Sequence, residues 1–271
     1  MTVEAPRNAL AARMQSLLFV PGTHPDRFAG ALASGADAVC IDLEDSVPPD
    51  AKDEAREAAL NALGDPRLCI RINGAGTKAG RADLAALEGG HVPLLLVPKV
   101  EGPDELAGIH GSVVPLIETP RGLRCAHEIG AAPGVVAMMF GGGDLSAELG
   151  VALAWEPLAH ARGAFLLACA EAGVPAIDVP FIDLDDAAGL QEETARAKAL
   201  GFAAKAAIHP RQIATIHAAM RPTADEVAEA RDAHAAFREA GGAAVRWRGR
   251  MLEAPLMRRY ARILQQGEAH A

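Results

Sequence analysis

Residues 36–47 read Ala-Asp-Ala-Val-Cys-Ile-Asp-Leu-Glu-Asp-Ser-Val, a short apolar run that ends in a cluster of acidic residues. The run Ala38–Asp42 has the continuous apolar character of a parallel strand that is buried on both faces. Downstream, Asp50 follows two prolines and is predicted to cap a helix that ends near Gly64. This stretch therefore predicts one βα unit, in which an acidic turn joins a buried strand to a helix.

The same pattern, a short apolar run followed by a helix-like segment, recurs along the chain. We predict eight strands, at Ser16–Val20, Ala38–Asp42, Leu68–Ile72, Leu94–Val97, Val113–Ile117, Val135–Phe140, Ala176–Val179 and Ala204–Ile208. Helices are expected between them, including one from Leu158 to Gly173 and one that Pro210 opens. Eight such units in roughly 200 residues predict an α/β fold, a (β/α)8 TIM barrel.

A doubly wound sheet is the alternative architecture. Its dinucleotide-binding fingerprint is a Gly-x-Gly-x-x-Gly loop after a strand. Residues 141–143 are three glycines after the sixth predicted strand, but residues 144–146 are Asp-Leu-Ser, so the third glycine of the fingerprint is absent. The barrel is therefore favoured.

The chain continues beyond the eighth unit. We predict a TIM-barrel catalytic domain at residues 1–221 and a C-terminal helical extension at residues 222–271. A capping-box pattern at Thr223–Glu226 marks the start of a helix in the extension. Residues 246–262 contain six arginines and a single acidic residue. These arginines are expected either to attract phosphate groups or to form a solvated helix face.

Composition argues against several classes of protein. The 26 basic and 35 acidic residues give a net charge of −9, which disfavours nucleic-acid binding because that binding depends on neutralising phosphates. No apolar run reaches the length of about 18 residues that a membrane helix needs. The first 15 residues lack the apolar core of a signal peptide and are expected to form an irregular lead. The four cysteines show no zinc-binding spacing, which indicates reduced thiols and a cytoplasmic location.

Polar side chains gather just after the predicted strands. The carboxyl ends of the strands in a TIM barrel meet at one face, where the active sites of this fold lie. We therefore expect a shared site at that face. The polar residues are Asp42, Glu44, Asp45, Arg71, Asn73, Lys99, Glu118, Asp144, Asp178 and His209.

Glu118 and Asp144 have the chemistry of a magnesium site. Two carboxylates plus water molecules are the usual share of Mg²⁺ ligands that a protein supplies, and Mn²⁺ accepts the same oxygen ligands. Glu44 and Asp45 are candidates for holding the metal-bound waters. The alternative is that Glu118 and Asp144 cap the helices that follow them, and both roles can coexist.

Arg71 and a pair of glycines are candidates for binding an anionic substrate. Arg71 is the one cation of an apolar strand and is predicted either to bind a substrate carboxylate through two hydrogen bonds or to pair with Glu44 or Asp45. The backbone amides of Gly142 and Gly143 are open to an anion, or these glycines serve only a tight turn.

Two basic side chains of the same face are interpreted as structural. Lys99 is a candidate for a Schiff-base lysine, but the adjacent Glu101 and the acidic surroundings favour a charged, ion-paired side chain. His209 precedes Pro210 and is expected to hold a loop rather than to act as an acid or base.

These residues lie in stretches that resemble one family. The stretches are residues 16–22 (SLLFVPG), 36–47 (ADAVCIDLEDSV), 71–73 (RIN), 97–101 (VPKVE), 115–122 (PLIETPRG), 140–150 (FGGGDLSAELG) and 201–213 (GFAAKAAIHPRQI). Each is weak alone, but together they are highly specific. The chain resembles the citrate lyase β-subunit-like group of the HpcH/HpaI aldolase superfamily, which also contains malyl-CoA and citramalyl-CoA lyases.

The resemblance implies a Mg²⁺-dependent lyase that cleaves or forms a 3-hydroxyacyl thioester of the malyl-CoA, citramalyl-CoA or citryl type. The products are a 2-oxo acid and an acyl thioester, so CoA enters as part of the substrate. Glu118 and Asp144 would be the metal ligands, with Glu118 also contacting the substrate, and Glu44 and Asp45 would support metal-bound waters. Arg71 would bind the 2-oxo acid carboxylate. A homo-oligomer, often a trimer, is implied, in which the C-terminal extension packs on a neighbouring subunit.

One departure from the family pattern lies in that extension. Residues 249–255 read Gly-Arg-Met-Leu-Glu-Ala-Pro, where related lyases carry Gly-x-Met-Ile-Asp-x-Pro and use the aspartate in the adjoining subunit. Glu253 replaces this aspartate, and its extra methylene displaces the carboxylate by about an ångström. Glu253 is therefore expected to act on a differently shaped substrate, to act slowly, or only to shape the interface.

Four other functions stay open at this stage. The chain could be a metal-dependent aldolase acting on free 2-oxo acids or a malyl-type thioesterase. It could also be a subunit of a citrate lyase complex that needs an acyl carrier protein. The fourth alternative is a metabolite sensor without turnover.

Overall fold

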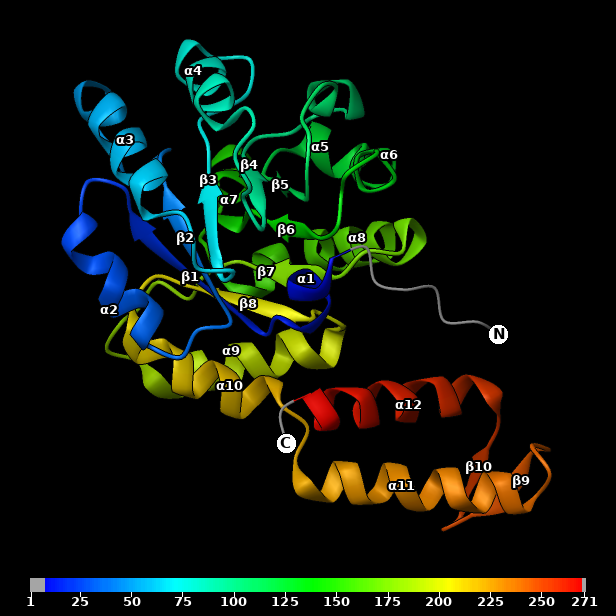
Figure 1. The fold of residues 1–271 in the computed structure, drawn as a ribbon. Coiled ribbons are helices and arrows are strands. Elements are labelled where there is room, and N and C mark those ends of the chain that lie inside the picture. The colour runs from blue at the N-terminus through cyan, green and yellow to red at the C-terminus, as the bar shows by residue number, and fades with distance from the viewer. Residues whose placement is uncertain (1–7, 270–271) are drawn as a thin grey trace. The chain divides into compact units, whose positions relative to one another are not determined.

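The computed structural model describes residues 8–269, and the chain divides into two compact units, one ending at Met220 and the other beginning at Arg221. In the first unit, eight parallel strands pair in chain order, and β8 pairs with β1 to close a barrel (Figure 1). The predicted (β/α)8 barrel is confirmed. The strands are β1 (Ser16–Pro21), β2 (Ala38–Asp42), β3 (Leu68–Arg71), β4 (Leu95–Val97), β5 (Val113–Ile117), β6 (Met138–Phe140), β7 (Ala176–Asp178) and β8 (Ala204–Ala207).

Helices surround the barrel and connect successive strands (Figure 1). The α-helices of the first unit are α1 (Ala9–Arg13), α2 (Phe28–Ala33), α3 (Lys52–Ala62), α4 (Lys78–Leu87), α5 (Pro120–Arg124), α6 (Ala126–Gly130), α7 (Gly142–Leu149), α8 (Trp155–Ala172), α9 (Ala187–Leu200) and α10 (Ile213–Met220). The short 3₁₀ helices are η1 (Pro25–Arg27), η2 (Pro49–Ala51), η3 (Pro103–Leu106) and η4 (Pro210–Gln212). Within residues 8–269, every helix falls short of the length or the apolarity that a membrane crossing demands.

Two local predictions were wrong. Asp50 lies inside η2, and the N-cap of α3 is Ala51, which makes no side-chain capping bond. The expected irregular lead contains helix α1, whose first amides are capped by the Asn8 side chain through bonds of 2.9 and 3.0 Å. Residues 1–7, the remainder of that lead, lie outside the described part of the chain.

The strands separate two apolar cores because successive side chains point to opposite faces of a strand. On β1, Leu17 belongs to the cluster inside the barrel, whereas Leu18 belongs to the larger cluster between the strands and the helices. On β2, Ala38 and Cys40 likewise belong to the inner cluster. The alternation therefore decides which strand-end residues face the inside of the barrel.

The second unit has its own small core and is not entirely helical. It contains α11 (Ala224–Glu239), the antiparallel strands β9 (Val245–Trp247) and β10 (Arg250–Leu252), and α12 (Ala254–Ala269). The predicted capping box at Thr223 is confirmed. The β-hairpin was not predicted. Its two-residue turn, Arg248-Gly249, has φ angles of 46° and 79°, the left-handed pair that a tight hairpin favours.

Candidate active site

A cavity of about 470 Å³ lies at the carboxyl ends of the barrel strands. One part of its wall is polar and consists of Asp42, Asp45, Ser46, Arg71, Glu118 and Asp144. The other part is formed by Phe19, Pro21, Leu116, Met139, Gly141, Gly143, Leu153, Val179, Pro180, Ile182 and Ile208. The cavity therefore suits a ligand with an anionic end and an apolar remainder.

Arg71 is fixed by Asp42, its register partner on the neighbouring strand. Its Nε and Nη2 donate to the two Asp42 oxygens, each at 2.7 Å, and its Nη1 lies 3.0 Å from Glu44 Oε2. Burial alone would raise the pKa of Asp42, but the bonds from Arg71 hold it below its usual value. The structural alternative for Arg71 is thus realised, with Asp42 and Glu44 as the partners.

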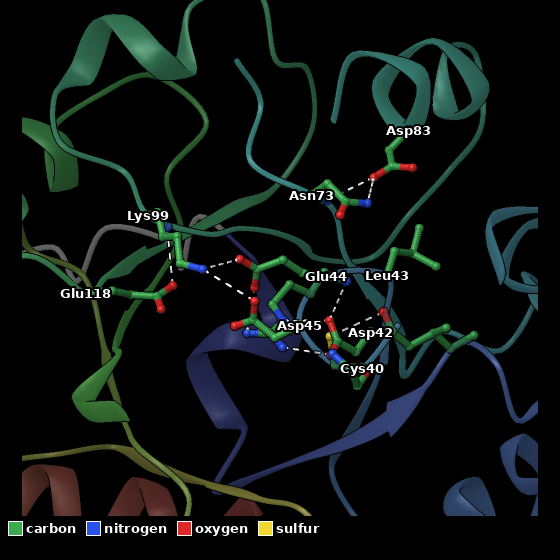
Figure 2. Close-up of polar contacts among 12 residues, drawn as sticks. Cys40, Asp42, Leu43, Glu44, Asp45, Asn73, Asp83, Lys99 and Glu118 are labelled. Carbon is green, nitrogen blue, oxygen red and sulfur yellow. Dashed lines mark hydrogen bonds and ion pairs between the residues drawn. The ribbon is translucent and has the colours of Figure 1, made fainter. Parts of the chain in front are cut away.

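Lys99 is a charged residue inside an acidic cluster. Its Nζ lies 2.9 Å from Glu44 Oε1, 3.4 Å from Asp45 Oδ1 and 3.2 Å from Asp144 Oδ2 (the first two contacts are drawn in Figure 2). Burial opposes the charge of Lys99, but Glu44 and the other carboxylates raise its pKa above the ordinary lysine value. A protonated amine is not a nucleophile, so the ion-paired interpretation holds and Schiff-base chemistry is disfavoured.

Glu118 and Asp144 form a hydrogen-bonded pair of carboxyl groups. Burial, the bond with Asp144 and the charge of Glu44 raise the pKa of Glu118 to about 8. Burial would also raise the pKa of Asp144, but its bonds with Glu118 and Lys99 hold it below the usual range. The raised pKa favours the protonated form of Glu118 near neutral pH, and a divalent cation would replace this proton because it binds the ionised carboxylate.

The backbone leaves room for this pair at one glycine. A Cβ built on Gly141 would lie 2.1 Å from Cγ of Glu118, so a larger residue there would push Glu118 out of position. Within residues 8–269, no group of three or more His, Cys, Asp or Glu side chains is arranged to hold a metal ion. Two oxygen-donor carboxylates plus waters are nevertheless the share that Mg²⁺ takes from many proteins, so the residues present fit this ion.

The capping alternative for the two carboxylates is not realised. The N-cap of α5 is Thr119, whose Oγ1 accepts the Gly122 amide at 3.0 Å, and the N-cap of α7 is Gly141. Asp144 lies in the first turn of α7, where a negative charge is favourable.

The two glycines predicted to bind an anion have different surroundings. Gly143 lines the cavity, whereas Gly142 packs against Phe140, Val179 and Leu153. Both lie in the first turn of α7, where backbone amides lack intrahelical partners.

Five of the ten polar strand-end residues do not line the cavity. Glu44 and Lys99 belong to the acidic cluster beside it, whereas the other three make contacts elsewhere. Asn73 donates twice to the buried Asp83 on α4, at 2.8 and 2.7 Å (Figure 2). His209 accepts the Arg211 amide at its Nδ1 and caps η4, so it holds a loop as predicted. Asp178 lies on the same face of β7 as Ala176, which points to the helices outside the barrel. The prediction that Asp178 belongs to the shared site is wrong.

Asp178 belongs to a buried ionic network between the strands and the helices. Its two oxygens bind Arg162 Nε at 3.0 Å and Lys205 Nζ at 2.8 Å. Lys205 also lies 2.8 Å from Glu193, and its side chain has no exposed surface. Two cations and two anions thus balance inside this layer, which is a structural role.

Glu253 lies in the second unit, between β10 and α12, and its side chain is exposed. Two of the six arginines in that unit pair with α11, since Arg248 lies 2.7 Å from Asp232 and Arg250 lies 3.4 Å from Glu229. The described cavity is lined by residues of the first unit. A role of Glu253 in a neighbouring site stays a prediction.

The sequence reasoning missed two functional features. The sequence places Asp42 among the strand-end carboxylates but does not predict that it fixes Arg71. In the sequence, Gly141 appears only as part of an incomplete Gly-x-Gly-x-x-Gly pattern. The register of β2 and β3 could have indicated the first, because equal distances to the strand ends make Asp42 and Arg71 neighbours. No sequence signal pointed to the second.

A closed parallel barrel with a fixed arginine beside paired carboxylates defines a class of TIM-barrel enzyme that binds a small carboxylate next to a cation. The chain belongs to the HpcH/HpaI aldolase/citrate lyase family, whose model matches residues 15–210. A second family model, described as a C–C bond lyase of the TIM-barrel fold, matches residues 153–271.

Individual relatives extend over nearly the whole chain. A citrate lyase subunit beta-like protein of Mycobacterium tuberculosis is 39% identical, over 93% of this chain and 95% of its own length. An L-malyl-CoA/beta-methylmalyl-CoA lyase of Rhodobacter capsulatus is 31% identical, over 93% of each chain. The crystal structure of the protein CitE from M. tuberculosis, in complex with magnesium, acetoacetate and coenzyme A, has a TM-score of 0.85. It is 38% identical, over 95% of this chain and 99% of that one.

Proposed function

We propose that the chain is a Mg²⁺-dependent carbon–carbon lyase that cleaves or forms a 3-hydroxyacyl thioester of the malyl-CoA, citramalyl-CoA or citryl type. In the cleavage direction the hydroxyl group loses its proton and becomes the carbonyl of a 2-oxo acid. The electron pair of the broken bond passes to the thioester fragment as an enolate, which takes up a proton. The observation that carries this proposal is the fixed Arg71 beside the Glu118–Asp144 pair in one cavity.

Arg71 has donors left for a substrate carboxylate. A guanidinium carries five N–H bonds. The contacts to Asp42 and Glu44 use Nε, Nη2 and Nη1, so each terminal nitrogen keeps one further N–H. Because the guanidinium is already fixed, binding a 2-oxo acid carboxylate costs little side-chain entropy. Arg71 would therefore orient this end of the substrate.

Glu118 and Asp144 would hold Mg²⁺, which, when bound, stabilises the negative charge on the substrate oxygen as the carbon–carbon bond breaks. Glu44 is buried beside Arg71 and Lys99, and Asp45 lines the cavity, so both are placed to accept hydrogen bonds from waters at the site. Gly143 would offer its backbone amide to the same anionic end of the substrate.

The remainder of the site concerns the thioester. The apolar wall that includes Leu153, Val179 and Ile182 would hold the acyl fragment and exclude water from the enolate. Coenzyme A is the carrier we favour, and an acyl carrier protein is the alternative.

The four free cysteine thiols agree with a cytoplasmic location.

A direct assay tests this function. The purified chain is incubated with Mg²⁺ and with malyl-CoA or citramalyl-CoA, and both the 2-oxo acid and free CoA thiol are measured. A lyase releases glyoxylate or pyruvate without free thiol, and EDTA abolishes the release. Free thiol together with malate identifies a thioesterase, and turnover of free 2-oxo acids alone identifies an aldolase. Turnover only with an acyl carrier protein identifies a subunit of a citrate lyase complex.

Glu253 is proposed to protonate the enolate in a neighbouring subunit of a homo-oligomer, for which a trimer is our first expectation. The substitution Glu253→Gln should then lower kcat without lowering Tm, because the side chain is exposed. Mixing inactive Glu253→Gln protein with inactive Glu118→Gln protein should restore part of the activity after subunit exchange. Lack of recovery in verified mixed oligomers would argue against a site shared between subunits.

A further inference from the structure

Lys99 touches both carboxylates of the proposed metal site. Its backbone amide donates to Glu118 Oε1 at 3.2 Å, and its Nζ lies 3.2 Å from Asp144 Oδ2 (the first contact is drawn in Figure 2). The same ammonium group also contacts Glu44 and Asp45, at 2.9 and 3.4 Å. One lysine therefore connects the two carboxylates with the acidic turn after β2.

The backbone at Lys99 is unusual. Its φ angle is 54°, in the left-handed region that non-glycine residues rarely adopt. Such a conformation is strained in a residue with a side chain and persists only where the surroundings require it. This backbone directs the amide of Lys99 to Glu118 while its ammonium group reaches Asp144, so the conformation serves both contacts.

The negative charge of Asp144 is paired with the ammonium group of Lys99. Arg71 is committed to Asp42 and Glu44. Lys99 is the cation that pairs with Asp144, and 43% of its side chain is exposed, so the ammonium group has room to move. A protein ammonium and a divalent cation at the same carboxylate repel one another, and they compete for its oxygens.

We propose that Lys99 is the resident counter-ion of the metal site, which holds Asp144 when no divalent cation is bound and yields it when the cation arrives. This inference rests on the metal site of the proposed function. Lys99 stays attached to Glu44 and Asp45 after the exchange, so the movement is a rotation of the side chain. In this role Lys99 stabilises the metal-free enzyme and lowers its affinity for Mg²⁺.

The test compares Mg²⁺ binding by the full chain and by Lys99→Met, which keeps the length of the side chain and removes its charge. We expect the Kd for Mg²⁺ to tighten roughly tenfold, measured by isothermal titration calorimetry. The Tm of the metal-free variant should fall, and Mg²⁺ should raise its Tm by more than it raises that of the parent chain. Neither measurement requires turnover.

Matched variants isolate the charge. Lys99→Arg keeps the cation and should leave the Kd within about twofold. Lys78→Met removes the same charge from an exposed lysine at the start of α4 and should change neither the Kd nor the metal-free Tm. If Lys99→Met does not fold, Lys99→Gln gives the same test with a side chain that can still donate a hydrogen bond to Glu44.

An unchanged or weaker Kd in the folded Lys99→Met variant would overturn the proposal, because Lys99 would then only position the carboxylates. The parent chain keeps the two hypotheses apart. If it binds Mg²⁺ and cleaves the thioester while the variant shows no gain in affinity, only the counter-ion role fails. If the parent chain itself binds no Mg²⁺, the metal-dependent function fails, and the role of Lys99 fails with it.

Discussion

Asp42 and Arg71 are register partners on β2 and β3, and their side chains join in two hydrogen bonds of 2.7 Å. Both continue the rows of side chains that point into the barrel, and both line the cavity. The Asp42 carboxylate accepts from Nε and Nη2 of the guanidinium. One N–H on each terminal nitrogen remains for a ligand. These two bonds hold the Arg71 guanidinium in one orientation, in which it can bind an anion.

Asp42→Asn should therefore damage both catalysis and stability. The amide group of asparagine faces the guanidinium with a donor, so Arg71 loses its orientation. We expect kcat/KM to fall about 10²-fold, the cost of a misplaced binding group. Loss of a buried partner should also reduce the free energy of unfolding by about 3–5 kcal/mol, measured by chemical denaturation.

Asp65→Asn is the matched control for this substitution. Asp65 makes the same two-bond contact with Arg67, at 3.1 and 2.9 Å, but on a more exposed pair. The kcat/KM of the Asp65→Asn variant should equal that of the parent chain. Equal activity losses in Asp42→Asn and Asp65→Asn would show that Asp42 has no special part in the site.

Gly141→Ala should weaken Mg²⁺ binding. The new methyl group would overlap Cβ, Cγ and Cδ of the buried Glu118, so this side chain must shift. We expect the Kd for Mg²⁺ to weaken at least about tenfold by calorimetry, because one of two carboxylate ligands moves. Gly163→Ala, where a Cβ meets open space, is the control and should bind as the parent chain does. Unchanged binding in Gly141→Ala would mean that Glu118 is not a ligand.

The Glu118 carboxyl should make Mg²⁺ binding depend on pH. Its pKa of about 8 exceeds the ordinary value of 4.5. Because the cation needs the ionised form, affinity should rise about tenfold per pH unit between about pH 5 and 8 and then level off. Calorimetry in buffers of different ionisation enthalpy should show the release of one proton near pH 7. Affinity that does not change with pH would contradict the raised pKa of Glu118.

The same raised pKa predicts the stability of the metal-free protein. A group whose pKa is higher in the folded state stabilises that state fully below its unfolded value, here 4.5. That contribution is lost as the pH rises through about 8. The Tm without metal should therefore decline across this window, and the increase in Tm caused by Mg²⁺ should grow. In Glu118→Gln both trends should disappear.

Lys205→Met should destabilise the barrel, and Lys205 itself does not line the cavity. The substitution leaves the buried Asp178 and the half-buried Glu193 with Arg162 as the remaining cation of the network. We expect the free energy of unfolding to fall by about 3–5 kcal/mol. Adding Glu193→Gln restores neutrality and should recover part of that loss. If the double variant is no more stable than the single one, uncompensated charge is not the cause.

The barrel was predictable from the sequence because its strands are buried on both faces. Buried parallel strands appear as continuous apolar runs, and the β2 and β5 boundaries match the prediction residue for residue. The sequence did not predict the hairpin at Arg248-Gly249, because its strands are only three residues long and lie in an arginine-rich segment. Short exposed strands leave little hydrophobic pattern to detect.

Sequence position alone could not separate the strand-end residues that enter the cavity from those that leave it. Arg71 and Asp178 both end a strand, yet one faces the cavity and the other the helices. A shift of one residue in a strand reverses the direction of a side chain. Predicted boundaries are no more precise than that shift.

The order of strands and helices, the cluster of carboxylates and the family were determined by the sequence itself, because apolar runs and local motifs are properties of neighbouring residues. Only the tertiary structure decided that Asp42 holds Arg71, that burial beside Asp144 raises the pKa of Glu118, and that Lys99 reaches Asp144. These contacts join residues on different strands. They depend on barrel closure and on strand register, which bring side chains that are distant in sequence together.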